Sequence, residues 1–380
     1  MLAFLLSSML AAPVPPEIER GRCRSAGAPV ERPCTLPTAV APPALAALLG
    51  NADQAWWMVG DRLTLIARPP EGAAASLCCA IQMPLEPIGG TDLQAITVRV
   101  PRADEALLDV MHLPSRRPPI PIPIRGVRAP PAPARAEPLA GRIETFQHRS
   151  DALGEERWVS VYLPPDIAPG EQLPLVYLTD QATVFYAPLA EAAAREGRAR
   201  RAIVVGLSPG RGEIACGAER CDRRGLEYLL DLEGSQAGTW FARHMMFVAD
   251  EIIPLIESRY PVSRRREDRI AAGHSNGASW ALAAAAMRPD LFGGVIAMSS
   301  GSAATADAAG RLANARIYAG AGLFEPEFVA TTERAADTAR RAGADVRYRT
   351  FVGGHSRTMW EIIFADGIAW LLPTGGSDAH

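Results

Sequence analysis

The fold is decided by residues 269–287, which read RIAAGHSNGASWALAAAAM. A short apolar run leads into a turn that holds Ser275 between two glycines, and a run of small residues typical of a helix follows. Gly273 and Gly277 remove side chains that would clash on such a turn. The G-x-S-x-G pattern alone is a weak signal, since it arises by chance in about one chain in eight of this length at average Gly and Ser usage. Its surroundings must therefore decide between a nucleophile and a polar residue in a loop.

Apolar runs and helical stretches alternate on both sides of this segment, from Arg142 onward. Several of the runs are apolar throughout, as in strands that helices cover on both faces. Residues 239–260 place apolar side chains at four-residue steps, which predicts one amphipathic helix. The alternation predicts an α/β fold of the α/β-hydrolase type, a doubly wound, mostly parallel sheet over residues 141–373. The runs read WVSVYL, LPLVYLT, AIVVGL, RIAAG, GGVIAMSS, ARIYAG and VRYRTF.

The first third of the chain has a different composition. Residues 13–45 are rich in Pro, Ala and Arg, which indicates a loosely structured leader. Short β-like runs separated by Gly, Pro and Asp predict a small β-sandwich-like domain over residues 46–114. The prolines of residues 115–140 are too frequent for a helix or a central strand and indicate an extended linker.

Composition excludes several classes of partner. The 380 residues are 48% hydrophobic and 21% charged, and the formal net charge is −3. This balance argues against nucleic acid or an anionic membrane as the main partner. No segment approaches the roughly 20 apolar residues of a transmembrane helix.

Residues 1–12 resemble a secretory signal peptide, with an apolar core at residues 2–10 and small residues at Ala11 and Ala12. The basic residues that usually precede such a core are missing. We expect a periplasmic or secreted protein, with the cytoplasm as the alternative.

The six cysteines agree with export, because disulfides persist in oxidising compartments. The neighbours Cys78 and Cys79 point to opposite faces of a predicted strand, so we expect each to be buried singly. No cysteine or histidine spacing fits zinc, and we expect no metal. Two other pairs bracket short loops and are suited to small disulfides: Cys23 with Cys34, and Cys216 with Cys221.

Three residues follow predicted strands in the chain order nucleophile, acid, base that α/β-hydrolases use. Ser275 lies between a strand and a helix, and His355 follows the last strand after two glycines. Glu325 lies a few residues beyond the end of another strand, and Glu327 is the reserve candidate. A carboxylate in this place would hold the imidazole in the tautomer of a general base.

An ester-cleaving site also needs backbone N–H groups for the developing oxyanion. One is expected from Asn276, directly after Ser275. The other is expected from the loop after LPLVYLT, at Asp180 or Gln181. His274, beside the serine, is interpreted as a packing residue.

With these residues in place, the second part of the chain resembles the esterase D family of α/β-hydrolases, and most of all the enterochelin (ferric enterobactin) esterases. The resemblance covers most of residues 141–373 and the N-terminal region in outline. The GGH motif with a tryptophan after four intervening residues is its most specific part. The matching pieces are RWVSVYLPP, LVYLTDQ, RRGLEY, AAGHSNGAS, GAGLFEPEF and GGHSRTMW.

The resemblance implies Ser275 as nucleophile, His355 as base and Glu325 as acid, with no cofactor. The R-x-x-E-Y motif implies that Arg224, Glu227 and Tyr228 either contact the substrate or brace the loops around the site. Two positions depart from the family pattern. Gln181 and Ala278 stand where glycine is usual, and Gln181 puts the second oxyanion donor in question.

The sequence therefore predicts a serine carboxylic-ester hydrolase that works through an acyl-enzyme on a small-molecule ester. The resemblance implies a siderophore ester of the enterobactin type. A feruloyl or acetyl esterase, or an acyltransferase of the same fold, is the first alternative. A hydrolase-fold binding protein without turnover is the second. The oligomeric state stays open.

Overall fold

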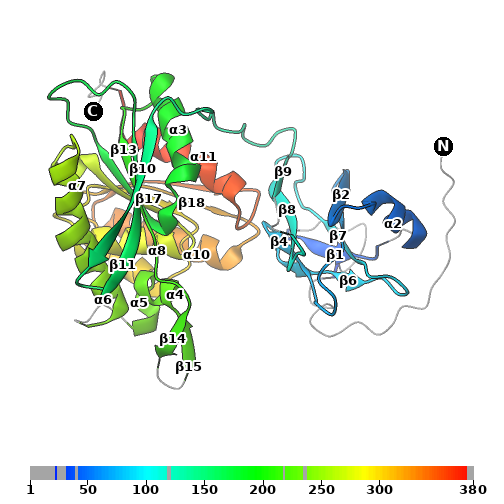
Figure 1. Ribbon diagram of the computed structural model, residues 1–380. Coiled ribbons are helices and arrows are strands. Elements are labelled where there is room, and N and C mark those ends of the chain that lie inside the picture. The colour runs from blue at the N-terminus through cyan, green and yellow to red at the C-terminus, as the bar shows by residue number, and fades with distance from the viewer. Residues whose placement is uncertain are drawn as a thin grey trace. The chain divides into compact units, whose positions relative to one another are not determined.

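A computed structural model describes residues 22–23, 31–38, 42–117, 121–216, 219–233 and 238–374 (Figure 1). The chain divides into two compact units, Met1–Ala129 and Pro130–His380. The signal peptide expected at residues 1–12 lies outside the described residues.

The first unit is built from two antiparallel sheets. One has the strand order β1-β7-β3-β2, with β6 beside β7, and the other has the order β5-β4-β8-β9. Helix α2 packs through Leu45 and Leu49 on Ile66 of β3. The elements are β1 (Cys34–Leu36), α2 (Pro42–Leu49), β2 (Gln54–Val59), β3 (Arg62–Ala67), β4 (Ser76–Cys79), β5 (Met83–Pro84), β6 (Glu86–Pro87), β7 (Gln94–Arg99), β8 (Leu107–Leu113) and β9 (Ile122–Arg125).

The boundaries of this unit are wider than the sequence indicates. Strand β1 and the start of α2 lie in the predicted leader, and β1 pairs with β7. Strand β9 lies in the predicted linker and pairs with β8. It is an edge strand, where Pro123 costs no ladder hydrogen bond if its missing N–H faces outward.

The cysteines confirm two expectations and overturn a third. Disulfides join Cys23 to Cys34 and Cys216 to Cys221. The expectation that Cys78 and Cys79 are buried singly is wrong, because they form a disulfide with each other. The peptide bond between them is cis.

The second unit holds an eight-stranded sheet with the order β10-β11-β13-β12-β16-β17-β18-β19. The β10–β11 and β11–β13 pairs are antiparallel and all the others are parallel. The predicted doubly wound, mostly parallel sheet is confirmed. Its elements are β10 (Arg142–Ser150), β11 (Glu155–Leu163), β12 (Leu175–Leu178), α3 (Thr183–Arg195), β13 (Ile203–Leu207), β14 (Glu213–Cys216), β15 (Glu219–Asp222), α4 (Arg223–Tyr228), α5 (Leu230–Glu233), α6 (Trp240–Met246), α7 (Ile253–Arg259), β16 (Arg269–His274), α8 (Asn276–Met287), β17 (Gly294–Met298), α9 (Ala303–Ala308), β18 (Arg316–Gly322), α10 (Pro326–Arg341), β19 (Asp345–Phe351) and α11 (Arg357–Leu371).

Helices cover both faces of this sheet, as the apolar strands require. Alternate strand residues such as Val295 join a core with α6 to α10. The next residue, Ile296, points to the other face, where it packs against Gly367 of α11. Helices α3 and α11 contact each other on that face (Figure 1).

The helix predicted over residues 239–260 is not regular. Helix α6 passes into a wider π turn, Phe247–Ile252, before α7 begins. Pro254 in the first turn of α7 explains the break, because proline has no N–H to donate and its ring crowds the preceding turn.

Candidate functional site

Ser275 occupies a strained turn between β16 and α8. Its backbone has φ 57° and ψ −130°, a conformation that L residues rarely adopt. A Cβ on Gly273 would lie 2.3 Å from the Gly277 carbonyl oxygen, and one on Gly277 would lie 2.0 Å from Thr179 Oγ1. Both glycines are therefore required by close contacts, as the sequence predicts. The serine itself is half-buried.

The loop after β12 faces this turn. A single 3₁₀ turn spans Thr179–Gln181, and Asp180 and Gln181 have φ of 61° and 53°. Gln181 therefore adopts the left-handed conformation for which glycine is usually chosen. The departure from glycine at this position therefore does not prevent a left-handed backbone in this structure.

The two expected N–H donors of this loop are not equivalent. The N–H of Asp180 already donates to Tyr228 Oη, at 3.2 Å. Asn276 is the first residue of α8, so its N–H has no partner one turn earlier in the helix. The geometry favours Gln181 over Asp180 as the partner of Asn276 in an oxyanion site.

Arg224 of α4 binds the loop that follows β12. Its guanidinium holds Asp180 through two hydrogen bonds, Nε to Oδ1 at 2.5 Å and Nη2 to Oδ2 at 2.9 Å. Burial by itself lowers the pKa of Arg224, but the bond to Asp180 and its charge outweigh burial, so the pKa is raised. Asp222 caps α4 by accepting from the Gly225 N–H, so one short helix presents both Arg224 and Tyr228.

Glu227 and Tyr228 have no exposed surface in this structure, which favours bracing over substrate contact among their two predicted roles. Glu227 Oε2 accepts from Arg157 at 3.0 Å and from the Gly210 N–H at 2.8 Å. Burial raises the pKa of Glu227, but the bond to Arg157 and nearby positive charges reverse this, and the net shift is downward. The alternative role, bracing of the loops, fits both residues. Arg224 keeps a partly exposed side chain.

Glu325 and His355 meet as the chain order predicts. His355 Nδ1 lies 2.6 Å from Glu325 Oε2. Glu325 is buried, and its Oε1 accepts from the Gly322 N–H at 2.7 Å. Glu327 is exposed at the start of α10, so Glu325 is the carboxylate that contacts the imidazole.

Trp360 of α11 connects the two sides of the site. Its ring stacks on His274, with centroids 4.5 Å apart, and meets His355 edge to face at 4.8 Å. His355 makes no hydrogen bond to Ser275 Oγ in this structure. Such bonds often tighten only when substrate binds. A serine, a histidine and a carboxylate in this arrangement can perform nucleophilic acyl chemistry.

His274 is held neutral. Burial lowers its pKa to about 4, and the positive charge of Arg224 acts in the same direction. Its Nδ1 lies 3.3 Å from Tyr186 Oη. The sequence interpretation of His274 as a packing residue agrees with these contacts.

The sequence did not single out Ser299 or give Trp360 a role at the site, although the GGHSRTMW motif contains the tryptophan.

We expect the second unit to lose stability as the pH falls from about 6.5 to about 4. His244 is fully buried with no hydrogen-bond partner for either ring nitrogen, and burial lowers its pKa to about 4 from the ordinary 6.5. In this window the unfolded chain binds protons at His244 and His274 that the folded chain does not, so the free energy of unfolding falls. Urea unfolding at pH 7, 6 and 5 measures the slope.

The matched variant for this prediction is His244→Phe, since the ring lies among Tyr228, Phe247 and Trp280. Its slope with pH should be shallower than that of the wild type. Equal slopes would show that His244 does not cause the pH dependence of the free energy of unfolding.

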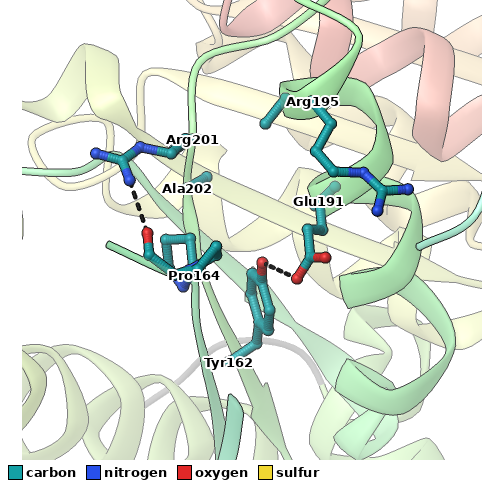
Figure 2. Close-up of a pocket in the computed structure, with 9 residues that line it drawn as sticks. Tyr162, Pro164, Glu191, Arg195, Arg201 and Ala202 are labelled. Carbon is teal, nitrogen blue, oxygen red and sulfur yellow. Dashed lines mark hydrogen bonds between the residues drawn. The ribbon is translucent and has the colours of Figure 1, made fainter. Parts of the chain in front are cut away.

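A cavity of about 110 Å³ lies away from this site (Figure 2). It is lined by the last turns of α3, the end of β11 and the residues before β13. The cavity therefore lies where the parallel strands begin, and Ser275 lies where they end. Tyr162 Oη donates to Glu191 there, and Glu191 accepts from the Ala140 and Gly141 N–H groups. These bonds anchor the chain where it enters β10. Among the described residues, no group of three or more His, Cys, Asp or Glu side chains is placed to hold a metal ion.

Comparison of the sequence with known families gives one match, to the family described as putative esterase, over residues 150–371. This segment contains the Ser275 turn, Glu325 and His355. The chain belongs to this esterase family. The family and the fold support a carboxylic-ester hydrolase. None of the curated proteins compared with the chain matches it.

Solved structures of similar fold include esterases of two kinds. The enterobactin esterase of Shigella flexneri has a TM-score of 0.63 at 17% identity, over 84% of this chain and 95% of its own. The ferric enterobactin esterase of Salmonella typhimurium has 0.63 at 18% identity, over 84% and 96%. A ferulic acid esterase has 0.50 at 18% identity, over 61% and 98%. The first two likenesses extend beyond the second unit into the first. No helix in the described ranges has the length and apolar character to cross a membrane.

Proposed function

We propose that this esterase is a serine hydrolase that works through an acyl-enzyme, with Ser275 as nucleophile, His355 as base and Glu325 as the orienting acid. The observation that carries the proposal is the 2.6 Å bond between His355 Nδ1 and Glu325 Oε2 at the strand ends beside the Ser275 turn. With Nδ1 engaged by the carboxylate, Nε2 is the nitrogen left to accept a proton.

Catalysis then proceeds in two half-reactions, formation of the acyl-enzyme and its hydrolysis. His355 Nε2 takes the proton of Ser275 Oγ, which attacks the ester carbonyl and forms a tetrahedral intermediate. The C–O bond to the alcohol breaks as His355 returns the proton to the leaving oxygen. In the second half, His355 deprotonates water, which attacks the acyl-enzyme. The bond to Ser275 Oγ then breaks as His355 returns the proton to that oxygen, and the acid is released. The buried carboxylate of Glu325 stabilises the imidazolium in both halves.

The oxyanion is proposed to bind the N–H groups of Asn276 and Gln181. The bond between Asp180 and Arg224 supports this, because it holds the loop against the Ser275 turn. Each donor in such a site is worth about 10²- to 10³-fold in kcat.

The proposed substrate is a siderophore ester of the enterobactin type. Support comes from the two enterobactin esterases, whose likeness to this chain covers both units, whereas the ferulic acid esterase matches only 61% of it. We also propose a periplasmic or secreted location, since the described residues contain three disulfides.

The substrate proposal is tested by steady-state hydrolysis of enterobactin, methyl ferulate and a p-nitrophenyl acyl series by the full chain. We expect kcat/KM for enterobactin to exceed the other values by at least about tenfold, the ratio expected from one well-matched contact in the transition state. If methyl ferulate or the simple esters are cleaved best, the siderophore substrate is wrong and ester hydrolysis stands. Added alcohol that diverts the acyl group to a new ester would indicate an acyltransferase instead.

A further inference from the structure

Strand β17 carries none of the three proposed catalytic residues, yet the residue that follows it contacts one of them. Ser299 Oγ donates to Glu325 Oε1 at 2.6 Å, and Trp360 Nε1 donates to Ser299 Oγ at 2.9 Å. Ser299 has no exposed surface and a φ of 61°. A buried serine in the left-handed conformation is unusual, because L residues pay a steric cost there. Its backbone N–H donates to the Gly320 carbonyl, which fixes the turn.

The directions of these hydrogen bonds follow from the chemistry of the groups. An indole N–H can only donate, so Ser299 Oγ must accept from Trp360. The one proton of the serine hydroxyl is then free to point at Glu325 Oε1. That oxygen also accepts from the Gly322 N–H at 2.7 Å. Two donors on this one oxygen hold the carboxylate in a single orientation.

The other carboxylate oxygen, Oε2, then faces His355 Nδ1 as an acceptor. The imidazole must place its proton on Nδ1 to satisfy it, and this leaves Nε2 unprotonated. A relay from Trp360 through Ser299 to Glu325 therefore selects the tautomer that a general base requires.

We propose that Ser299 and Trp360 are positioning residues that act through Glu325 on His355, an inference that rests on the proposed function. Trp360 also contacts the site through its ring, which packs on both His274 and His355. Its N–H and its ring can be separated by substitution, because phenylalanine keeps a ring and has no N–H.

The test compares the pH–rate profiles of kcat/KM on a p-nitrophenyl ester for wild type, Ser299→Ala, Trp360→Phe and the double variant. Ser299→Ala should lower kcat/KM by roughly 10- to 100-fold, the range for one lost hydrogen bond to a charged group. Its acidic limb should move to higher pH, because a carboxylate that has lost a donor holds the proton on His355 more tightly. Trp360→Phe should move the limb in the same direction by a smaller amount.

The double variant should shift the acidic limb by less than the sum of the two single shifts, since the N–H of Trp360 acts through Ser299 while its ring also contacts His355. The control is Ser300→Ala, which removes a neighbouring buried hydroxyl that bonds Ser279 and not Glu325. It should keep the wild-type limb. A structural role for Ser299 would lower the fraction of folded enzyme and leave the limb in place.

Two results would overturn the relay: an unmoved limb in Ser299→Ala, or a shift in the double variant that equals the full sum of the two single shifts. Either leaves the proposed function intact if Ser275→Ala is inactive. If Ser275→Ala keeps wild-type activity, the proposed function fails first, so the two failures are distinguishable. Ser299→Gly, which suits a φ of 61°, replaces Ser299→Ala if the alanine variant does not fold.

Discussion

Replacing Ser275 with alanine is expected to lower kcat for ester hydrolysis by at least about 10⁴-fold, as loss of a nucleophile does in other serine hydrolases. The variant removes one oxygen and keeps the Cβ, so the turn and its close contacts with Gly277 and Thr179 are unchanged. Initial rates on a p-nitrophenyl ester measure the effect, and circular dichroism checks the fold.

The matched control is Ser279→Ala. Ser279 lies one turn along α8, is fully buried, and bonds Ser300 Oγ at 3.0 Å. Its loss should change stability and leave the chemical step close to wild type. If Ser275→Ala retains wild-type activity, the nucleophile lies elsewhere.

Replacing Glu227 with alanine is expected to destabilise the second unit by about 3–5 kcal/mol, the cost of removing one partner from a buried ion pair. The side chains of Arg157 and Arg223 are 2% and 8% exposed, and both contact Glu227. Without the carboxylate these cations lose a buried counter-charge, and the Gly210 N–H loses its acceptor. Urea unfolding at pH 7 measures the loss.

Glu213→Ala serves as the control, because Glu213 pairs with Arg220 on the exposed β14–β15 hairpin. An exposed pair is worth only about 0–1 kcal/mol. If Glu227→Ala does not fold, Glu227→Gln keeps the size and removes the charge, and its loss should still exceed that of Glu213→Ala. Similar losses at both positions would contradict the bracing role.

The fold of the second unit could be predicted because its strands and helices alternate in the sequence with clear periodicities. The Ser275 turn could also be predicted, since the serine lies between Gly273 and Gly277, after an apolar run and before a run of small residues typical of a helix. The boundaries of the first unit could not be predicted from the sequence. Strand β9 contains Pro123 and lies in a proline-rich segment, where only the pairing with β8 makes it a strand.

The site was predicted in part. Glu325 and His355 could be paired from chain order, and the structure brings them within a hydrogen bond. The motif left open whether Glu227 and Tyr228 contact the substrate or brace the loops, because residue spacing does not report burial. Ser299 was missed because its contact with Glu325 depends on the register of β17 beside β18, which no local pattern encodes.

The backbone conformation of Gln181 could not be predicted from the sequence either. Its φ is 53°, and it follows Asp180, which Arg224 holds by hydrogen bonds. Propensity alone would assign this conformation to glycine. The loop after β12 therefore has a left-handed residue at position 181 although that residue is not glycine.

The most direct test of the central claim is to find which residue carries the acyl group. The full chain is treated with an alkyl fluorophosphonate, digested and mapped by mass spectrometry, with Ser275→Ala in parallel. We expect a single adduct on Ser275 that forms with loss of esterase activity, and no adduct in the variant. An adduct at another residue, or equal labelling of the variant, would contradict the assignment of Ser275 as the nucleophile.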